Sequence, residues 1–482
     1  MEHSEWIPAL IYSLDLLIRI GLSLRILSRS LSVGVTFAWM IIVLAVPFLG
    51  AFIYLLIGEN RLGERRVARA KQIIEQSRPW RETLCHETAQ SSLTTPPAYT
   101  SLDLQARKII GYPTLPGNRL QLLTDYEAIF RSLVDDVRNA RVSCWFEFYI
   151  LETGGLVDNL LETIHEANRR GVKINILLDS LGSKGFLKSE ACKNLCEAGV
   201  LVTECLHVSA ARMLFQRVDI RNHRKIAVID NHVAYTGSQN LVDPRFFKQG
   251  AGVGEWIDMM IRMEGPAVGV LENIVTMDWS VESGRTASFS TESISLNPVG
   301  DTRVQVVPSG PVFREGAIHQ LLMAVIYTAH RELVITTPYF APDDALTEAL
   351  VAAANRGVEV TLVIPARVDS RMVRYATPAL LERLIAAGIR VALFDGGLLH
   401  TKSITVDGSF CIAGSVNMDM RSLWLNFEIS LFVYDTEFCG KLRELQNDYI
   451  SQSTRVDPEH FRSRSKPQRL VASIMRLFAP LL

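Results

Sequence analysis

The hydrophobic positions of the chain follow two different patterns. Residues 31–57 form an apolar run without a charge, and as a helix rising ~1.5 Å per residue this run exceeds the ~30 Å hydrocarbon core of a bilayer. Beyond a Ser/Thr/Pro-rich stretch at 91–100, short apolar runs of strand length alternate with amphipathic helical segments. The pattern therefore predicts a membrane-spanning helix over 31–57, followed by a larger α/β part.

The segment that precedes this run, 7–27, is apolar but contains Asp15, Arg19 and Arg25. Asp15 and Arg19 are spaced i,i+4, so on a helix they can pair and lower the cost of burying both charges. We expect a second spanning helix here, with an amphipathic helix at the membrane interface as the alternative. Residues 1–60 are thus predicted to form a transmembrane helical hairpin.

The charge of the chain becomes predominantly basic after residue 57. Basic residues outnumber acidic ones between 61 and 81, which places this segment and the remainder of the chain on the cytoplasmic side of the membrane. The whole chain has 50 Lys and Arg against 51 Asp and Glu, a balance that argues against nucleic acid as a partner. Its seven cysteines include no CxxC pair, which favours reduced thiols over disulfides or a metal site.

The part beyond the linker repeats itself. The run ANRRGV at 167–172 returns as ANRGV at 354–358, and each copy reads as a helix that ends at a glycine before an apolar strand. We therefore expect two similar α/β lobes that form one cleft. The predicted divisions are an anchor at 1–60, a basic juxtamembrane segment and linker at 61–100, a first lobe at 101–280, a linker at 281–300, a second lobe at 301–454 and a basic amphipathic tail at 455–482.

One repeated motif contains residues that are suited to catalysis. Its first copy places His223, Lys225 and Asp230 in the pattern HxKxxxxD, its second places His400, Lys402 and Asp407, and a G-S-x-N run follows each copy. On a strand, residues i and i+2 share a face, so the histidine and lysine of each copy project together. Two such lobes would surround a phosphate with two imidazoles and two ammonium groups, with an acid and a nucleophile on opposite sides.

The duplicated motif resembles the signature of the phospholipase D superfamily. The stretches 235–249, 256–258 and 398–428, together with the anchor, are similar to bacterial cardiolipin synthases that begin with two helices. The resemblance implies lobes that are mixed sheets flanked by helices, in a multi-pass protein of the bacterial inner membrane. It also implies transfer of a phosphatidyl group between two phosphatidylglycerol molecules, giving cardiolipin and glycerol through a phosphohistidine, without metal or cofactor.

The resemblance also suggests a role for each polar residue. The motif aspartates, Asp230 and Asp407, are expected to frame the strand ends. By their positions downstream of the motifs, Asp258 and Glu428 are candidates for orienting the imidazoles, and an ordinary charge on a strand surface is the alternative for both. The symmetric motifs do not distinguish the nucleophile, for which family analogy favours His223. Six residues are expected to hold the substrate phosphate: Lys225, Lys402, Asn240, Asn417, Ser238 and Ser415.

The sequence leaves other functions open. A phospholipase D or a phosphatidylserine synthase would use the same chemistry with water or serine as the acceptor. A nuclease fits poorly with the charge balance and the anchor. A membrane-tethered phospholipid-binding scaffold is the non-enzymatic alternative, although both His-Lys pairs are intact.

The repeat is asymmetric before the motif. Gly199 lies 24 residues before His223, whereas Gly388 lies 12 before His400. The additional residues fall within 205–221 and mix arginines with large apolar side chains, which favours docking on an anionic bilayer; packing onto the other lobe is the alternative. The docking candidates are Arg212, Leu214, Phe215 and Arg217.

Overall fold

The computed structural model of the protein describes residues 3–29, 33–59, 61–89, 95–207, 217–285 and 296–456. The chain divides into two compact units. The first consists of the described residues up to Val67 together with 217–220, and the second contains the rest. Each unit is described by itself.

The first unit contains three apolar helices, α1 (His3–Leu27), α2 (Val33–Ala45) and α3 (Leu49–Ile57). The single helix expected over 31–57 is therefore wrong, since the chain is interrupted at 46–48. Pro47 has no N–H to continue the helix, and Phe48 adopts a positive φ of 48°. Within the described residues, Trp6–Leu27 is the one helix that is long and apolar enough to cross a membrane.

The charges of α1 stabilise this interruption. Arg19 and Asp15 pair at 2.5 Å, as the sequence predicts. The Asp15 carboxylate accepts a hydrogen bond from the backbone N–H of Phe48 at 3.2 Å, and Arg19 donates to the carbonyl of Leu44 at 2.6 Å. Backbone groups released by a helix break need new partners, and the ion pair of buried Asp15 and half-buried Arg19 supplies them.

The segment expected as a juxtamembrane linker is mostly helical. It forms α4 (Glu64–Gln76), α5 (Arg78–Ala89), the 3-10 turn η1 (Pro97–Tyr99) and then α6 (Thr100–Ile110). Trp80, Leu84 and Tyr99 are buried in the main hydrophobic core. The prediction of a linker over 61–100 is corrected by this packing, because a few large apolar side chains anchor an otherwise polar segment.

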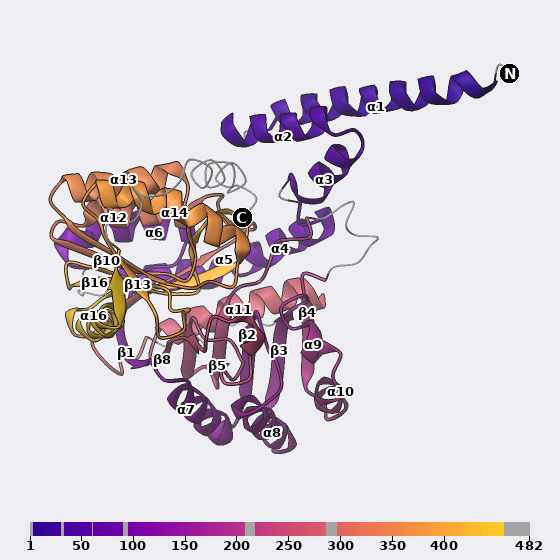
Figure 1. Cartoon of the computed structure of the whole chain (residues 1–482). Helices are drawn as coiled ribbons and strands as arrows, with labels where there is room; N and C mark the ends of the chain where they lie inside the picture. Colours follow the sequence, from indigo (N-terminus) through magenta and orange to yellow (C-terminus); the bar gives the residue numbers. More distant parts are fainter. Residues whose placement is uncertain are drawn as a thin grey trace. The chain divides into compact units, whose positions relative to one another are not determined.

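The first lobe alternates strands and helices (Figure 1). Helices α7 and α8 cover one face of its strands and α11 covers the other. Its elements are β1 (Leu115–Leu123), α7 (Tyr126–Asn139), β2 (Ser143–Phe148), α8 (Leu156–Arg169), β3 (Lys173–Asp179), α9 (Lys184–Leu187), α10 (Glu190–Glu197), β4 (Leu201–Cys205), β5 (Lys225–Ile229), β6 (Val233–Gly237), η2 (Gln249–Ala251), β7 (Trp256–Ile257), β8 (Met260–Glu264) and α11 (Ala267–Ser283).

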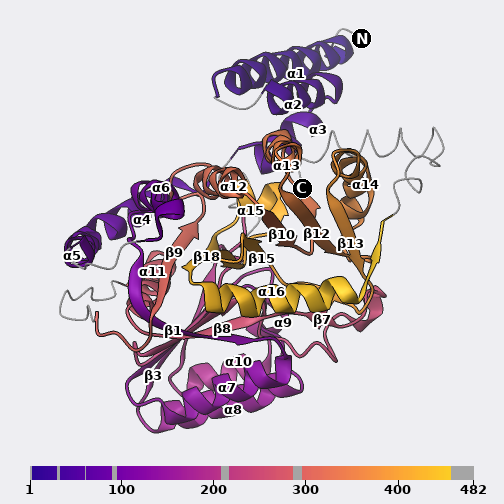
Figure 2. The ribbon, with the colours of Figure 1, turned by 90° about the vertical axis from the view of Figure 1, so that its left-hand side faces the viewer.

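The second lobe repeats this order, and its last helix, α16, runs across the strands in Figure 2. Its elements are β9 (Thr302–Ser309), α12 (Ala317–Thr328), β10 (Glu332–Thr336), β11 (Phe340–Ala341), α13 (Asp344–Asn355), β12 (Glu359–Pro365), α14 (Arg371–Ala386), β13 (Arg390–Phe394), β14 (Leu398–Leu399), β15 (Ser403–Val406), β16 (Phe410–Gly414), β17 (Met418–Asp419), α15 (Met420–Trp424), β18 (Glu428–Tyr434), α16 (Thr436–Ser451) and β19 (Ser453–Arg455). Thus α11 extends into the expected linker at 281–300, and β19 extends the lobe by one residue.

The two predicted lobes are confirmed, and their sheets join into one. The strand order is β19-β13-β12-β10-β15-β16-β18-β9-β1-β8-β6-β5-β2-β3-β4, with an antiparallel β1–β9 pair at the junction. Each half has three neighbouring parallel strands and, toward the centre, antiparallel strands; in the second half β19 lies outside the parallel strands and pairs antiparallel with β13. The mixed sheet therefore has an approximate twofold arrangement, which places the motif strands β5 and β15 at equivalent positions in the two halves.

Candidate active site

Each motif histidine lies just before its strand and is held by the opposite lobe. The backbone N–H of His223, before β5, donates to the carbonyl of Phe427 at 2.8 Å. The backbone N–H of His400, before β15, donates to the carbonyl of Ile257 at 2.8 Å. These bonds bring the segment of one lobe that carries the imidazole against the segment of the other lobe that carries a carboxylate.

The imidazoles pair with the two predicted carboxylates across the lobes. His223 Nδ1 lies 2.8 Å from Glu428 Oε2, and His400 Nδ1 lies 2.6 Å from Asp258 Oδ1. All four side chains are buried. An Nδ1–H that donates to a carboxylate leaves the lone pair of Nε2 available for attack or proton transfer. The geometry thus forms two His–carboxylate dyads, each completed by the other lobe.

Burial sets the charge of these dyads. It lowers the pKa of His223 to about 4 and that of His400 to about 3, although the paired carboxylates act in the opposite direction. Burial raises the pKa of Glu428 and Asp258, but the adjacent histidine, lysine and serine of each carboxylate together outweigh it and leave both carboxyl pKa values below the ordinary range. The resting dyads therefore combine a neutral imidazole with an ionised carboxylate.

Two buried lysines complete the cluster. Lys225 Nζ donates to the carbonyl of His223 at 2.6 Å, and Lys402 Nζ donates to that of His400 at 2.5 Å. Burial lowers the pKa of Lys225 to about 7 and that of Lys402 well below its usual range. The lysine of each lobe also lowers the pKa of the histidine in the other lobe. The four groups therefore share one electrostatic environment that favours an anion.

The two serines have different contacts from those expected. Ser415 donates to Glu428 Oε2 at 2.5 Å and accepts the N–H of Ile429 at 2.9 Å. Ser238 accepts the N–H of Met259 at 3.0 Å, and its hydrogen bond to Asp258 helps to lower the pKa of that carboxyl. Their hydroxyl groups therefore fix the carboxylate segments, and a role of these serines in holding phosphate stays a prediction.

The two asparagines keep a polar atom without a partner among the described residues. Asn240 uses Oδ1 to accept the N–H of Ile150 at 3.1 Å, which leaves its buried Nδ2 unpaired. Asn417 is buried with an unpaired Oδ1, while its side chain also hydrogen-bonds Asp419. An unpaired buried amide group is costly unless a ligand completes it. The Nδ2 of Asn240 can donate to a substrate oxygen, whereas the Oδ1 of Asn417 can only accept from a donor such as a hydroxyl group.

The motif aspartates lie at the far ends of their strands. Asp230 accepts the backbone N–H groups of Arg141, Val142 and Ser143 at 2.8–2.9 Å. Asp407 makes the equivalent three contacts with residues 330–332, at 2.7–3.0 Å. Each aspartate therefore ties the motif hairpin to the start of the neighbouring strand, which is the framing position expected from the sequence.

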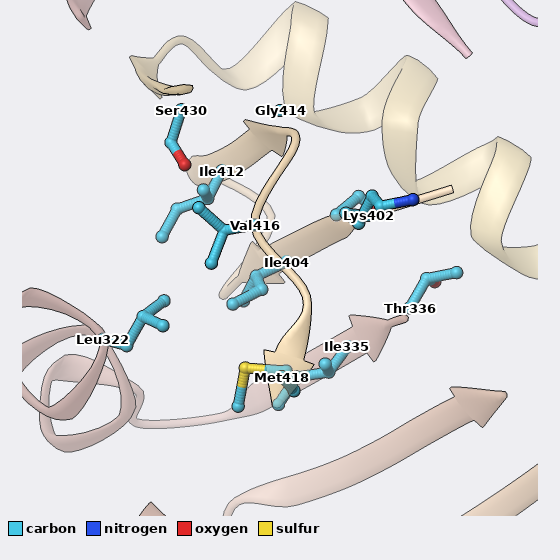
Figure 3. Close-up of a pocket in the computed structure, with 11 residues that line it drawn as sticks. Leu322, Ile335, Thr336, Lys402, Ile404, Ile412, Gly414, Val416, Met418 and Ser430 are labelled. Atoms are coloured by element: carbon cyan, nitrogen blue, oxygen red, sulfur yellow. The ribbon is translucent and has the colours of Figure 1, made fainter. Parts of the chain in front are cut away.

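A small cavity of about 20 Å³ lies behind Lys402 in the second lobe, large enough for about one water molecule. Figure 3 shows Leu322, Val416 and Met418 on its apolar side, while the Lys402 nitrogen points away from them. The buried hydroxyl groups of Thr336 and Ser430, which also line it, have no partner among the described residues.

The sequence did not reveal a buried ionic group behind the first dyad. Arg224, the middle residue of the first HxK run, is fully buried between the rings of Phe313 and Phe427. Its guanidinium donates to the carbonyl of Glu428 at 3.0 Å, contacts Asp278 and lies 4.0 Å from buried Glu147. The available signal was the motif position alone, which predicts neither the burial nor the partners.

Aromatic rings that the sequence analysis did not single out also flank the histidines. The ring of Tyr149 lies 5.1 Å from that of His223, and the ring of Trp256 lies 4.3 Å from that of His400. Both aromatic side chains come from segments beside the strands that carry the dyads. They limit the space from which a substrate can approach each imidazole.

The proposed membrane-docking residues lie mostly outside the described residues. This applies to Arg212, Leu214 and Phe215. The basic amphipathic tail predicted at 455–482 also lies almost entirely outside the described residues. Arg217 is described, and its buried guanidinium pairs with Asp219 at 2.6 Å. Its expected role at lipid headgroups is therefore corrected, because this guanidinium is held within the protein.

Across the described ranges, no group of three or more His, Cys, Asp or Glu side chains is arranged to hold a metal ion.

Comparisons with known proteins agree with this geometry. The family model described as "Cardiolipin synthase, PLD-like domain" matches residues 133–250 and 322–449, and the one described as "Phospholipase_D-nuclease N-terminal" matches 17–59. The chain is 43% identical over 471 residues to cardiolipin synthase A of Yersinia pseudotuberculosis strain PB1/+, covering 96% of each chain. The chain belongs to the phospholipase D-like cardiolipin synthase family. The family predicted from the sequence is therefore confirmed.

Two further relatives add to this assignment. Cardiolipin synthase A of Yersinia pestis is 43% identical over 469 residues, again covering 96% of each chain. The solved phosphatidylserine synthase of Haemophilus influenzae matches at a TM-score of 0.60 and 13% identity, over 79% of this chain and 98% of that chain. The similarity to that structure supports the two-lobe fold of the family and nothing finer.

Proposed function

We propose that this protein is a cardiolipin synthase that transfers a phosphatidyl group from one phosphatidylglycerol to another and releases glycerol. The observation that carries the proposal is the pair of cross-lobe dyads, each beside a buried lysine. Such an arrangement suits a two-step displacement at phosphorus, in which one imidazole attacks and the other handles protons. Relatives of 43% identity over nearly the whole chain bear the name cardiolipin synthase.

The first step requires one neutral and one protonated imidazole. Nε2 of His223 forms a bond to phosphorus while the bond from phosphorus to the glycerol oxygen breaks, and His400 gives its proton to that oxygen. Burial keeps the pKa of His400 at about 3 before substrate binds. A phosphodiester anion beside the imidazole favours its charged form, so substrate binding itself raises this pKa toward a useful value.

The second step reverses the proton movement. His400, now neutral, takes the proton from a glycerol hydroxyl of a second phosphatidylglycerol, whose oxygen bonds to phosphorus as the P–N bond to His223 breaks. Glu428 and Asp258 keep each Nδ1 protonated throughout, so both reactions use Nε2. Lys225, Lys402 and the side-chain N–H of Asn240 hold the phosphate oxygens.

The membrane placement belongs to the same proposal. We place α1 and the α2–α3 pair as a hairpin in the bacterial inner membrane, with the basic segment after residue 57 on the cytoplasmic side. The Asp15–Arg19 pair and its contacts at 44–48 support burial of the interrupted helix in an apolar environment. Confinement to the bilayer raises the effective concentration of a lipid acceptor relative to water.

Turnover of purified protein tests this function. Phosphatidylglycerol labelled separately in its phosphatidyl and headgroup parts is incubated with the enzyme, and the products are resolved. Cardiolipin and free glycerol in equal amounts are expected. Phosphatidic acid as the main product would indicate a phospholipase D, phosphatidylserine formed on adding serine would indicate a phosphatidylserine synthase, and absence of turnover would indicate a binding scaffold.

A further inference from the structure

A transfer between two phospholipids places two phosphodiester anions near each other. The phosphate that reacts has Lys225 and Lys402, whose ammonium groups are buried beside the dyads. The acceptor lipid carries a phosphodiester of its own, a three-carbon glycerol away from the attacking hydroxyl. The electrostatic cost of bringing it close must be offset by another cation on the side where the acceptor enters.

Lys248 is such a cation. Its ammonium lies 5.2 Å from the centre of the Trp256 ring, and that ring lies 4.3 Å from the ring of His400. The Lys248 ammonium and the imidazole of His400 thus both lie against the same indole. Its side chain is 46% exposed, whereas Lys225 and Lys402 are buried, so a lipid headgroup arriving from solvent or the bilayer surface can reach it.

The backbone at Lys248 is held in an unusual conformation. Its φ of 49° lies in the left-handed region, which is uncommon for residues other than glycine. Neighbouring Phe247 and Trp256 are buried together with Val253 and Leu398 from the two lobes. This packing fixes the loop between β6 and β7 and aims an exposed lysine over the indole beside His400. Unfavourable backbone conformations of this kind persist where the surroundings require them.

The present partner of Lys248 can be exchanged. The ammonium lies 3.3 Å from Asp369 of the second lobe, and Asp369 also accepts a hydrogen bond from the Tyr339 hydroxyl at 2.7 Å. An exposed ion pair contributes little on its own, and Tyr339 continues to satisfy the carboxylate if the lysine turns to a phosphodiester. The indole Nε1 of Trp256 is buried without a partner among the described residues, and it is a donor that a phosphodiester oxygen can complete.

We propose that Lys248, together with the indole N–H of Trp256, binds the phosphodiester of the acceptor phospholipid beside His400. The inference rests on the proposed transfer between two phospholipids and adds how the second one is recognised. Glycerol and other neutral alcohols lack this phosphodiester and do not use the site. Lys248 thereby favours lipid acceptors over small alcohols.

The experiment compares two acceptors in the full-length protein. Cardiolipin formation from short-chain phosphatidylglycerol needs the acceptor phosphodiester, whereas exchange of labelled glycerol into phosphatidylglycerol uses the same donor and the same histidines with a neutral acceptor. Lys248→Gln should lower the ratio of cardiolipin formation to glycerol exchange at least tenfold, mainly through a higher KM for the acceptor. Lys248→Arg should restore most of the ratio, and Trp256→Phe should shift it in the same direction to a smaller extent.

Lys441 provides a matched control, since it is also an exposed lysine paired with a carboxylate, Glu437, at 2.7 Å. Lys441→Gln should leave the ratio unchanged. An equal loss of both reactions in Lys248→Gln would assign Lys248 to the general structure of the site and overturn the inference, as would an unchanged ratio. A wild-type protein that forms no cardiolipin yet exchanges glycerol would instead refute the proposed function.

Discussion

Replacing Arg224 by Met removes a buried charge while keeping an apolar side chain between Phe313 and Phe427. The guanidinium is fully buried, contacts Asp278, lies 4.0 Å from Glu147 and donates to the carbonyls of Glu428 and Ser309 at 3.0 and 3.1 Å. Those carbonyls belong to paired residues at the end of the β9–β18 ladder. Arg224 therefore connects the first lobe to the strand that carries the carboxylate of the first dyad.

The expected cost depends on the unpaired groups that the substitution leaves behind. Removing one partner of a buried ion pair typically costs about 3–5 kcal/mol, which for a unit of this size lowers the thermal midpoint by about 5 °C. Burial already raises the pKa of Glu147 to about 7, and the charge of Arg224 opposes this rise. Without Arg224 the pKa of Glu147 rises further, so Glu147 stays neutral at pH 5 and resists ionisation at pH 8.

The sign of the pH dependence is set by proton binding. A carboxyl group whose folded pKa is raised contributes stability below its unfolded pKa and loses it as pH rises. The difference in thermal midpoint between wild type and Arg224→Met should therefore be larger at pH 8 than at pH 5. Adding Glu147→Gln should recover much of the loss at pH 8. Because Arg224 holds the Glu428 strand, activity of the single variant should fall more than its stability alone explains.

Thr401, at the equivalent position of the second motif, offers a control. It makes neutral hydrogen bonds to the Tyr449 hydroxyl at 3.1 Å and the Ile257 carbonyl at 3.3 Å. Thr401→Val should cost about 1 kcal/mol or less, without dependence on pH. Thermal unfolding of the detergent-solubilised protein at both pH values measures all of these variants. A loss in Arg224→Met that is small, or equal at pH 5 and pH 8, would refute the reasoning from the buried charge.

Three other predictions concern the dyads and the anchor. Glu428→Gln and Asp258→Asn should each lower kcat about 100-fold or more. Each substitution removes a charge-assisted hydrogen bond worth about 1.5–3 kcal/mol and the control of the imidazole tautomer. Steady-state assays measure this loss, and full activity of either variant would contradict the prediction. Burial lowers the pKa of His400 from 6.5 to about 3, so below pH 6.5 the unfolded chain binds a proton that the folded protein does not, and the free energy of unfolding falls as the pH is lowered. The thermal midpoint of His400→Gln should therefore fall less than that of wild type between pH 7 and pH 4. Identical profiles would disprove the assignment. Removal of residues 1–60 should leave activity on detergent-dispersed lipid but weaken binding to vesicles, which a flotation assay measures. A truncated protein that folds but is inactive would show that the helices form part of the active site.

The sequence was most informative where residue identity and periodicity act together. The i,i+2 spacing of His223 and Lys225, repeated in the second motif, correctly predicted that histidine and lysine lie together, and the repeat predicted two lobes. The cross-lobe pairing of Asp258 and Glu428 required contacts between segments far apart in the sequence. Their positions downstream of the motifs make both carboxylates candidates, but spacing alone does not show which carboxylate faces which histidine.

Other features depend on tertiary packing that local patterns do not encode. The interruption of the helix expected over 31–57 was signalled by Pro47, but prolines are tolerated in membrane helices, so the break could not be predicted. Ser238 and Ser415 follow glycines in a phosphate-binding type of run, yet their hydroxyl groups contact the carboxylate segments. The burial of Arg224 could not be predicted, because arginine is rarely buried without partners and its partners come from distant segments.

The most direct test of the two-histidine mechanism is to trap the phosphoenzyme. His400→Ala and His223→Ala are each mixed with phosphatidylglycerol labelled in its phosphatidyl part and quenched under conditions that preserve phosphohistidine, and the label is located by peptide mass spectrometry. The account predicts label on His223 in His400→Ala, no label in His223→Ala, and cardiolipin from neither variant. Cardiolipin formed at a substantial rate by either variant would contradict the cooperation of two histidines across the lobes.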